Sequence, residues 1–507
     1  MTAQVYRIIG APGTGKTTTI RGTIMQWIER DNYDPEQIIL TSFTTAAAKV
    51  LRERVPVPDR NCATIHALCY RGLGNPPLAM KGELRKEWNA LCIKKGVGSW
   101  CIGDTKQDED EPVTDAGQDH RLEQYGYWRI VGRPESFLAK DLQPFIEEWE
   151  AFKKRTGSID FTDMLEHGLS RLSNCPGSPT ILCVDEAQDL NPLQWALIKQ
   201  WQQGVDRLLI AGDAAQCLYQ WQGATPDLLM TPWEGEQYYL LPKSNRLPAR
   251  IQRYAEGWLH EHSGDLCVGR EYAPIKDKDG IPIEGHISFS DATWKDVEPI
   301  VDEIELQARV RKVMVLATCG YMLQPLLNEL RSRGIAYHNP YSPKNRSWNP
   351  GSEKGWHAAG QLMEGGQDWY SWGQHLPAIH FNGFKNAAAG KPAGEALTGE
   401  VYQRVYLGHD WRYYLGLVKD QRAIEYALRC IDNEWESPTV IVGSVHSVKG
   451  GEADCVVIFP DVSPAGYDEM DTDRDATIRQ FYVAMTRAKD ELILCRPASN
   501  TRCIEWP

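Results

Sequence analysis

The residues with the clearest chemical potential lie in Gly10–Thr17, GAPGTGKT, directly after a short apolar run. Glycines at this spacing let backbone N–H groups surround phosphate oxygens, and the helix expected to follow adds its partial positive charge. Lys16 can reach the β- and γ-phosphates, and Thr17 can ligate Mg²⁺. The alternative interpretation is a glycine-rich turn that binds nothing. We expect the whole loop to bind a nucleoside triphosphate through Gly10, Ala11, Pro12, Gly13, Thr14, Gly15, Lys16, Thr17 and Thr18.

A second candidate site lies in Ile181–Asp189, ILCVDEAQD, where an apolar strand ends in two adjacent carboxylates. Ligands of parallel sheets bind at the carboxyl ends of the strands. Asp185 can therefore hold Mg²⁺ through water, and Glu186 can orient or deprotonate an attacking water. Adjacent Asp and Glu favour hydrolysis over kinase-type transfer, because a kinase must exclude water. The alternative is an acidic strand end on the surface.

A third stretch, Leu208–Ala224, again runs from an apolar strand into Gly-Asp and a glutamine. Gln216 can sense the γ-phosphate from this position. Tyr219 and Trp221 offer flat faces on which unpaired bases can stack, at roughly 1–3 kcal/mol per base. Under the alternative interpretation both aromatic side chains belong to the core.

Two stretches nearer the C-terminus, Ser444–Asp454 and Gln480–Leu492, have the form of sensor and arginine-finger segments. An arginine that reaches a phosphate bound by another domain stabilises transition-state charge, with rate effects of about 10³–10⁵. Arg487 is the candidate for this role. Taken alone, the local sequence predicts that Arg487 is a surface residue of a helix. Only the series of motifs favours the arginine-finger role.

The elements that must position these residues alternate along the chain, as short runs rich in valine, isoleucine and leucine followed by amphipathic stretches. Such strands indicate parallel sheets covered on both faces. We predict an α/β fold with two cores, in which helices flank parallel sheets and each core carries an inserted, mainly helical or irregular subdomain. The expected ranges are 1–66 and 160–242 for the first core, 67–159 for its insertion, 243–340 and 437–507 for the second core, and 341–436 for its reduced or atypical insertion.

The net charge of −13 is unfavourable for a nucleic-acid-binding protein, but two acidic runs carry most of it. Residues 104–119 hold seven acids and one lysine, and residues 468–475 hold five acids and one arginine. We interpret both runs as solvated loops, and the alternative is a regulatory or partner-binding tail. Without them about −3 is left for the rest of the chain, which permits a local basic groove.

Composition also indicates a compartment. The sequence contains no secretory signal and no apolar run of membrane-spanning length, so we expect no membrane contact. Thirteen scattered cysteines without a C-x-x-C pair indicate reduced thiols. We expect a cytoplasmic protein of a bacterial or phage-infected cell, or one associated with the nucleoid.

Nine motifs in order along the chain resemble those of superfamily 1 helicases, and most closely the UvrD/Rep branch. They are Gly10–Thr17, Leu40–Val55, Ala63–Leu68, Asp160–Leu165, Val184–Gln194, GDAAQCLYQWQGA, Ser244–Pro248, VHSVKGGEAD and YVAMTRAKDEL. The resemblance extends over nearly the whole chain at the level of motifs, and the two insertions are least covered. It implies two RecA-like P-loop cores and ATP hydrolysis coupled to movement along DNA.

The resemblance also implies a role for individual residues. The Mg-ATP site would be formed by Lys16, Thr17, Asp185 and Glu186. The γ-phosphate would be surrounded by Gln216, Arg246 and Arg487, and the ribose contacted by Glu452. The single-strand track would be lined by Phe43, Thr64, His66, Tyr219, Trp221 and His446. The form HSVKGGE is more similar to the 3′→5′ branch than to the 5′→3′ branch.

Several positions depart from the family pattern. Asn245 stands where the family has an aromatic residue that stacks on adenine, Gln222 replaces a common arginine, and Gly451 replaces a leucine in a tight turn. The segment before the first motif, MTAQVYR, is too short to supply the family's adenine-reading glutamine, which predicts relaxed base selectivity. No nuclease domain is expected after Pro507.

From these residues we predict an ATP-dependent, Mg²⁺-requiring translocase and helicase of 3′→5′ polarity that acts on single-stranded and tailed duplex DNA. Hydrolysis at a cleft between the two cores would drive strand movement. Two other classes share the motifs: an RNA-directed helicase, and a nucleotide-switched interaction protein without unwinding activity. Comparing the stimulation of ATP hydrolysis by DNA and by RNA oligonucleotides distinguishes the RNA-directed helicase from the DNA helicase. Nucleotide-dependent binding of a partner, without strand displacement, would identify the interaction protein.

Overall fold

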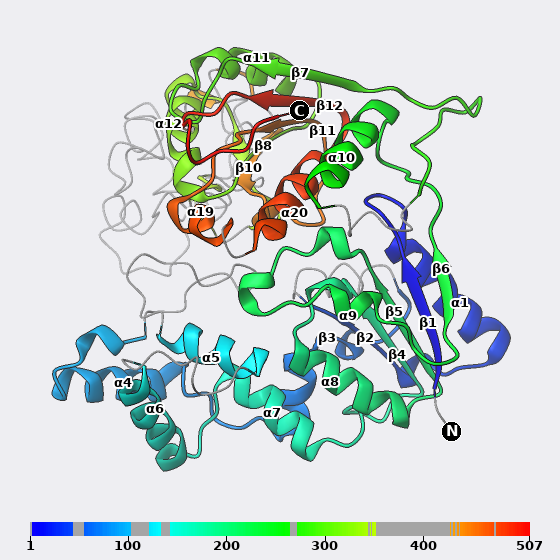
Figure 1. The fold of residues 1–507 in the computed structure, drawn as a ribbon, viewed down its shortest axis with the longest axis vertical. Coiled ribbons are helices and arrows are strands. Elements are labelled where there is room, and N and C mark those ends of the chain that lie inside the picture. Colours follow the sequence, from blue (N-terminus) through cyan, green and yellow to red (C-terminus); the bar gives the residue numbers. More distant parts are fainter. Residues whose placement is uncertain are drawn as a thin grey trace, which may run out of the picture. The chain divides into compact units, whose positions relative to one another are not determined.

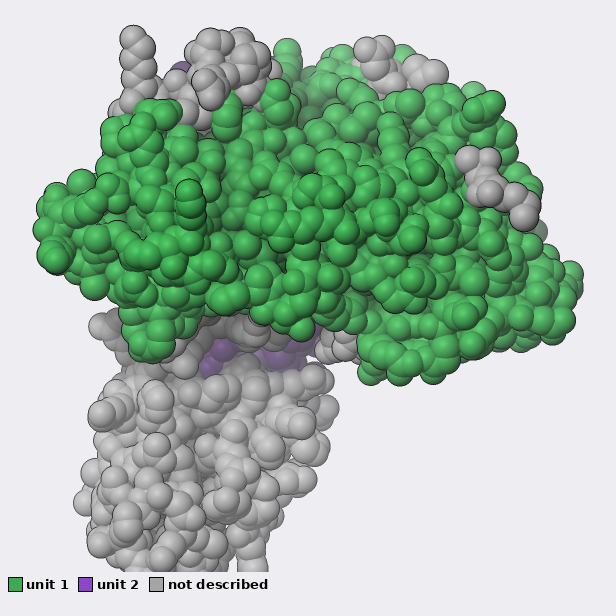
Figure 2. Space-filling view, turned by 90° about the horizontal axis from the view of Figure 1, so that it is seen from below, with its two compact units in different colours: residues 1–285, 469–486 green, residues 286–468, 487–507 purple. Residues whose placement is uncertain are grey.

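The protein divides into two compact units, which Figure 2 shows in different colours. Unit 1 comprises Met1–Gly285 and Glu469–Thr486, and unit 2 comprises His286–Asp468 and Arg487–Pro507. This computed structural model describes residues 3–43, 55–102, 121–132, 142–263, 271–342, 345, 347–350, 426, 429–430, 433–435, 437–470 and 473–506. The acidic run at 104–119 and most of the predicted second insertion lie outside these residues. Within the described part of the chain, no helix has both the length and the apolar character needed to cross a membrane.

A six-stranded parallel sheet forms the centre of unit 1, in the strand order β3-β2-β4-β5-β1-β6 (Figure 1). The strands are β1 (Gln4–Ile9), β2 (Ile38–Ser42), β3 (Cys62–Thr64), β4 (Ile181–Asp185), β5 (Arg207–Gly212) and β6 (Gln237–Leu240). The register pairs Ile8 with Ala211 and Ser42 with Asp185. Parallel pairing brings the carboxyl ends of the strands to one edge, where Gly10, Asp185 and Asp213 lie at the ends of β1, β4 and β5.

Both faces of this sheet are covered, because successive side chains of a strand point to opposite sides. In β4, Ile181 and Cys183 belong to the same buried cluster as Ile24 of α1, while Leu182 and Val184 belong to the cluster on the other face. The covering helices are α1 (Lys16–Asp31), α3 (Ile65–Gly72), α7 (Phe161–Arg171) and α8 (Pro192–Trp201). The predicted parallel sheet with flanking helices is confirmed.

Three helices of the predicted first insertion have a buried core of their own: α4 (Gly82–Lys94), α5 (Arg121–Val131) and α6 (Gln143–Thr156). Trp88 of α4 meets Trp149 of α6 edge to face, with ring centroids 4.8 Å apart. Phe145 and Phe152 flank Trp149, since residues three and four positions apart share one helix face. Aromatic packing therefore holds this subdomain together.

Unit 2 is built around a second parallel sheet, in the order β7-β12-β11-β8-β10-β9. Its strands are β7 (His286–Ser290), β8 (Val313–Ala317), β9 (Tyr337–His338), β10 (Val440–Ser444), β11 (Ala453–Ile458) and β12 (Ala488–Cys495). Helices α11 (Glu298–Ala308) and α12 (Gln324–Arg333) add Ile304, Leu326 and Leu330 to its buried core. The second predicted α/β core is thus confirmed.

The helix before β12, α20 (Arg474–Met485), groups with unit 1 although it lies between two strands of unit 2 in the sequence. It packs against α10 (Ala249–His262), where Trp258 Nε1 donates to the carbonyl of Ile478 at 3.3 Å. From the sequence we placed both helices in the second core. The division into compact units instead places them in unit 1, with the first sheet. Two further α-helices of the described residues are α9 (Asp227–Met230) and α19 (Pro464–Met470).

Candidate nucleotide-binding site

The nucleotide loop predicted from the sequence connects the end of β1 to the first residue of α1. Gly13 and Gly15 have φ angles of 72° and 85°, in the left-handed region that favours glycine. At Gly10 the constraint is space, because a Cβ there would lie 2.4 Å from Thr14 Oγ1. Thr14 donates to the carbonyl of Ala11 at 2.8 Å. The loop is therefore held in a tight turn at a helix N-terminus, the position at which backbone N–H groups bind phosphate.

Two side chains at the start of α1 connect this loop to its surroundings. Lys16 is buried, and its Nζ donates to the carbonyl of Gly10 at 2.9 Å, so the ammonium group lies against the loop backbone. Thr17 Oγ1 lies 3.3 Å from Asp185 Oδ2. The fold thus brings together the two residues predicted to bind Mg²⁺, which are 168 positions apart in the sequence.

The environment of Asp185 suits a divalent cation. Burial, followed by the charge of Glu186, raises the pKa of the Asp185 carboxyl to about 7, and the charge of Lys16 opposes this rise. A hydroxyl and a carboxylate are the hard oxygen ligands that Mg²⁺ prefers. A bound cation would compensate the buried charge, so these residues fit the expected ion.

Glu186 begins a chain of hydrogen bonds that joins the ends of β4 and β5. Its N–H donates to Asp185 Oδ1 at 2.9 Å. The Gln188 side-chain amide donates to the Glu186 carboxylate, and its oxygen accepts from the N–H of Asp213 at 3.1 Å. Gln216 Nε2 donates to Asp213 Oδ2 at 2.7 Å. The predicted catalytic residues Glu186 and Gln216 are therefore linked through Gln188 and Asp213. No role was predicted for these two linking residues, although both lie just after strand ends within the motifs.

The segment that contains Arg246 lies directly against the nucleotide loop. Ser244 Oγ donates to the carbonyl of Pro12 at 2.9 Å, and the N–H of Asn245 donates to the carbonyl of Gly13 at 2.8 Å. The approach is so close that a Cβ on Gly13 would lie 2.4 Å from the Cβ of Arg246. Arg246 is thus placed at the loop, and its γ-phosphate role stays a prediction. Ser244 was missed because a partner 232 positions away leaves no local pattern.

Phe43 and Tyr219, two of the residues predicted to contact single-stranded DNA, lie next to each other. Their ring centroids are 4.8 Å apart and their planes are inclined at 37°. Tyr219 is only 4% exposed, so the core interpretation describes its position here, and base stacking on its ring would require rearrangement. Trp221 is half-buried in the turn that follows. The DNA-binding role of these three residues stays a prediction.

Thr64 and His66 lie at the N-terminus of α3. Thr64 Oγ1 accepts from the N–H of Ala67 at 3.2 Å and so caps the helix. The His66 ring meets Phe161 edge to face, with centroids 6.0 Å apart. Burial lowers the pKa of His66 to about 4, so its imidazole is neutral at pH 7. A contact from His66 to a DNA strand would therefore place no positive charge against the DNA phosphates.

In unit 2, the predicted arginine finger and the predicted ribose contact are close together. Arg487 is 2% exposed, and its Nη1 donates to the carbonyl of Gly451 at 3.3 Å. The next residue, Glu452, pairs with Lys489 at 3.3 Å. His446 is half-buried in the 3₁₀ turn after β10. The alternative interpretation of Arg487 as a surface helix residue is wrong, because Arg487 is buried directly before β12.

Comparison with protein families matches two regions of the chain. Residues 1–232 match the UvrD/REP helicase N-terminal domain, and residues 439–495 match the UvrD-like helicase C-terminal domain. The chain belongs to the UvrD/Rep-like helicase family. This membership confirms the resemblance found in the nine motifs, and the two parallel sheets are the RecA-like cores of a UvrD-family protein.

Individual relatives of this UvrD/Rep-like chain are distant. YjcD of Bacillus subtilis (strain 168) is 27% identical over 249 residues, which cover 44% of this chain and 32% of the relative. The ATP-dependent DNA helicase UvrD2 of Mycobacterium bovis is 25% identical over 267 residues, covering 44% and 36%. The ATP-dependent DNA helicase PcrA of Leuconostoc citreum is 26% identical over 251 residues, covering 43% and 31%. The chain thus spans about a third of the length of these relatives.

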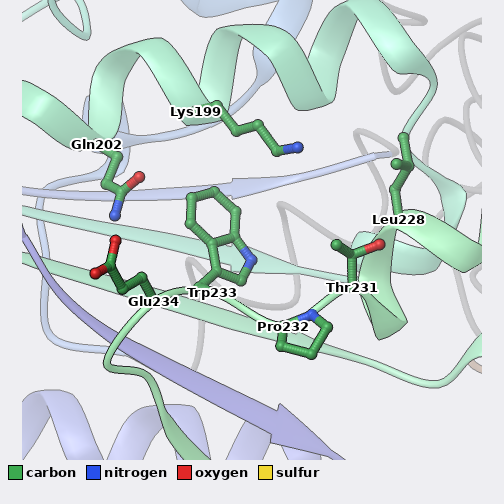
Figure 3. A pocket seen from close by; sticks show the side chains of 7 residues that line it. All are labelled: Lys199, Gln202, Leu228, Thr231, Pro232, Trp233 and Glu234. Atoms are coloured by element: carbon green, nitrogen blue, oxygen red, sulfur yellow. The ribbon is translucent and has the colours of Figure 1, made fainter.

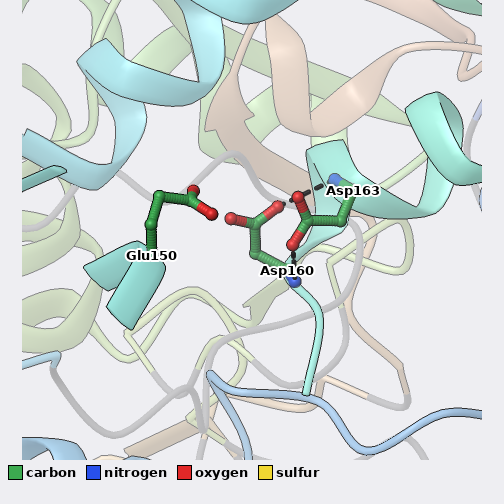
Figure 4. Close-up of side chains that lie close together, drawn as sticks. All are labelled: Glu150, Asp160 and Asp163. Carbon is green, nitrogen blue, oxygen red and sulfur yellow. Dashed lines mark hydrogen bonds between the residues drawn. The ribbon is translucent and has the colours of Figure 1, made fainter. Parts of the chain in front are cut away.

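The UvrD/Rep-like chain also contains a cluster of three carboxylates between α6 and the start of α7: Glu150, Asp160 and Asp163 (Figure 4). Lys153 Nζ lies 2.8 Å from Asp160 Oδ2 and 2.6 Å from Asp163 Oδ2. The Arg129 guanidinium of α5 pairs with the same two aspartates. Since two buried cations balance the carboxylates, this cluster is an ion network rather than a metal centre.

A surface pocket of this UvrD/Rep-like chain lies between the end of α8 and the loop after α9 (Figure 3). Lys199 Nζ lies 6.0 Å from the centroid of the Trp233 ring within it. The other lining residues are Gln202, Leu228, Thr231, Pro232 and Glu234. This lining includes none of the residues predicted to bind nucleotide or DNA, so the pocket is separate from the candidate site.

Proposed function

We propose that this protein is an ATP-dependent translocase and helicase that moves along single-stranded DNA with 3′→5′ polarity. The observation that carries the proposal is the 3.3 Å approach of Thr17 Oγ1 to Asp185 Oδ2, directly beside Glu186. This approach brings the glycine-rich loop, the residues proposed to hold the cation and a candidate general base to one edge of a parallel sheet. The names of the relatives UvrD2 and PcrA support ATP as the nucleotide and DNA as the polymer.

The nucleotide loop would hold the triphosphate of ATP. Backbone N–H groups at the start of α1 would bind phosphate oxygens, and Lys16 would exchange the carbonyl of Gly10 for the β- and γ-phosphates. Thr17 and Asp185 would hold Mg²⁺. When bound, this ion neutralises phosphate charge and orients the γ-phosphate for in-line attack.

Glu186 would orient the attacking water and accept its proton. Gln188 holds the Glu186 carboxylate, and Asp213 holds Gln216, so a change at the γ-phosphate can pass along one hydrogen-bonded chain. Arg246 and Arg487 would stabilise the charge that develops on the phosphate oxygens. Hydrolysis would in this way be coupled to strand movement.

The DNA strand would be held by stacking and by backbone contacts. Stacking on aromatic faces tolerates any sequence, and phosphate contacts supply most of the affinity. Tailed duplexes would be the substrates for unwinding, since a tail supplies the single strand for loading. The proposed strand contacts are Phe43, Thr64, His66, Tyr219, Trp221 and His446.

The first test measures ATP hydrolysis with and without single-stranded DNA. We expect strong stimulation by DNA. Glu186→Gln should keep ATP binding and lose at least about 10²-fold in turnover, because it removes the general base. Glu29→Gln, at an exposed position of α1, is the matched control and should hydrolyse ATP as the wild type does. Unchanged turnover in Glu186→Gln contradicts the assignment, and equal stimulation by RNA oligonucleotides indicates an RNA-directed enzyme.

The second test measures strand displacement on duplexes that carry a single-stranded tail at one end. We expect ATP-dependent unwinding of 3′-tailed duplexes and little unwinding of 5′-tailed ones. The reverse preference would show that the polarity is wrong while the motor function holds. Nucleotide binding without displacement on either substrate would instead indicate a nucleotide-switched interaction protein.

A further inference from the structure

Gly451, which replaces a leucine of the family motif, is crowded by the ring of Tyr341. A Cβ at position 451 would lie 2.6 Å from Tyr341 Cε2 and 2.7 Å from Tyr341 Cζ. The preceding Gly450 has a φ of 82°, whereas Gly451 has no such left-handed conformation. Space rather than backbone conformation therefore requires glycine at position 451. The tyrosine ring, together with the carbonyl oxygen of Val448 at 2.9 Å, occupies the volume that a side chain at this position would need.

The turn that carries Tyr341 is held by Asn339, which is fully buried. Asn339 Nδ2 donates to the carbonyl of Val442 at 3.1 Å and to Ser447 Oγ at 3.2 Å. Its Oδ1 accepts from the N–H of Tyr341 at 3.0 Å. One buried amide thus ties this turn to the end of β10 and to the residue after His446. These bonds hold the backbone from which the Tyr341 ring projects.

The backbone that Tyr341 covers supports two residues with proposed nucleotide contacts. The N–H of Glu452 donates to the Tyr341 hydroxyl at 3.4 Å. On the other side, Arg487 Nη1 donates to the carbonyl of Gly451 at 3.3 Å. A shift of the peptide between residues 451 and 452 would therefore move both the Glu452 side chain and the anchor of the Arg487 guanidinium.

We propose that Tyr341 is a positioning residue for nucleotide binding, whose ring fixes the backbone at Gly451 and thereby orients Glu452 and Arg487. This inference rests on the proposed function, which assigns Glu452 to the ribose and Arg487 to the γ-phosphate. Tyr341 is half-buried and lies outside the apolar core of unit 2. We therefore expect the packing of the sheet to tolerate removal of this ring.

The first experiment compares Tyr341→Ala and Tyr341→Phe in the full chain, with Tyr467→Ala as a control at an exposed tyrosine of α19. Tyr341→Ala should raise the KM for ATP about five- to tenfold and narrow the discrimination between ATP and 2′-deoxy-ATP. Tyr341→Phe keeps the ring and should stay within about twofold of the wild type. Sugar discrimination is a readout that a loss of stability alone does not move. Unchanged KM and discrimination in Tyr341→Ala would overturn the proposal.

The second experiment is a double-mutant cycle with Gly451→Leu, which also covers the case in which Tyr341→Ala folds poorly. Gly451→Leu alone forces the ring aside and should raise the KM for ATP. Combined with Tyr341→Ala, the overlap with the ring is gone and only the contact of the new Cβ with the Val448 carbonyl oxygen, at 2.9 Å, remains. The increase in KM of the double variant should therefore be smaller than the product of the two single increases. If the two effects simply add, the ring and position 451 do not share space and the proposal fails.

Calorimetric binding of a non-hydrolysable ATP analogue separates this inference from the proposed function. Wild-type binding without DNA-stimulated turnover would overturn the proposed motor, while the affinities of the variants would still test Tyr341. Normal wild-type turnover, together with identical affinities in all variants, would overturn the Tyr341 proposal alone.

Discussion

At the scale of single residues, close packing distinguishes glycines that look alike in the sequence. Gly13 in the nucleotide loop combines a φ of 72° with direct contact to Arg246. Gly22, on the exposed face of α1, has open space where a Cβ would lie. The two glycines therefore contribute to stability in opposite ways. Gly13 is required by its surroundings, whereas Gly22 only weakens a helix.

We expect Gly13→Ala to lower the free energy of unfolding by roughly 1–3 kcal/mol, because the new Cβ is strained and overlaps Arg246. It should also abolish ATP binding. Gly22→Ala should raise stability by roughly 0.5–1 kcal/mol and leave ATP binding unchanged. Thermal unfolding with and without ATP measures both effects. Equal midpoints for the two variants would show that contact with Arg246 does not constrain the loop.

His66 supplies a pH dependence that can be measured. Its pKa is lowered to about 4 in the folded protein by burial, while the unfolded chain titrates near 6.5. As the pH falls below 6.5, the unfolded state binds a proton that the folded state does not, so stability is lost down to pH 4. At pH 5 the loss attributable to His66 should be about 1–2 kcal/mol. Urea unfolding of wild type and His66→Gln between pH 7.5 and 5 measures it, and parallel pH profiles would contradict this origin.

At the scale of elements, a buried ion network joins the helices of the first insertion to α7. Lys153 of α6 and Arg129 of α5 are 4% and 7% exposed, and both pair with Asp160 and Asp163. Trp149 Nε1 also donates to Asp160 Oδ2 at 3.0 Å. The two aspartates form the capping box of α7. One network thus fixes two helices, α5 and α6, to the start of a third, α7.

We expect Lys153→Met to destabilise the protein by about 3–5 kcal/mol, because it leaves buried carboxylates without one of their cations. Lys154→Met, one position along at an exposed site, should change stability by less than about 0.5 kcal/mol. Chemical denaturation of both variants at pH 7 measures the difference. Similar midpoints would mean that Arg129 alone compensates the two aspartates.

At the scale of the whole molecule, the chain passes between the two units at 285–286, 468–469 and 486–487. Helix α20 therefore belongs to one unit by packing and follows a strand of the other unit in sequence. Each unit has its own buried cores around a parallel sheet. The motifs of the C-terminal half are consequently distributed over both units.

The net charge of −13 leads to a prediction about DNA binding. A few phosphate contacts, rather than a broad basic surface, should supply the electrostatic part of the affinity. We expect the logarithm of the binding constant for single-stranded DNA to fall against the logarithm of salt concentration with a slope of about −2 to −4. Fluorescence anisotropy between 50 and 300 mM salt, roughly the range in which phosphate contacts are released, measures it. A slope near −10, as for a repressor with many contacts, would contradict the prediction.

Much of the fold and part of the candidate site could be predicted because they depend on residues that are neighbours in sequence. The apolar runs, the glycine spacing and the carboxylates at a strand end identified both parallel sheets, the nucleotide loop and Asp185. Backbone conformation and the periodicity of burial are local properties, so a sequence read residue by residue reveals them. Asn245 and Gly451 were visible only as departures from a pattern, without a cause.

Tertiary packing decided the contacts between distant segments. Thr17 meets Asp185 and Ser244 meets Pro12 across 168 and 232 positions, and Tyr341, the first residue of the predicted second insertion, contacts Gly451 in the core segment that follows it. No local pattern encodes such pairs, because they depend on how whole elements dock. The sequence by itself therefore determined the family and the motifs, while the tertiary structure decided which side chains share a site and which helix joins which core.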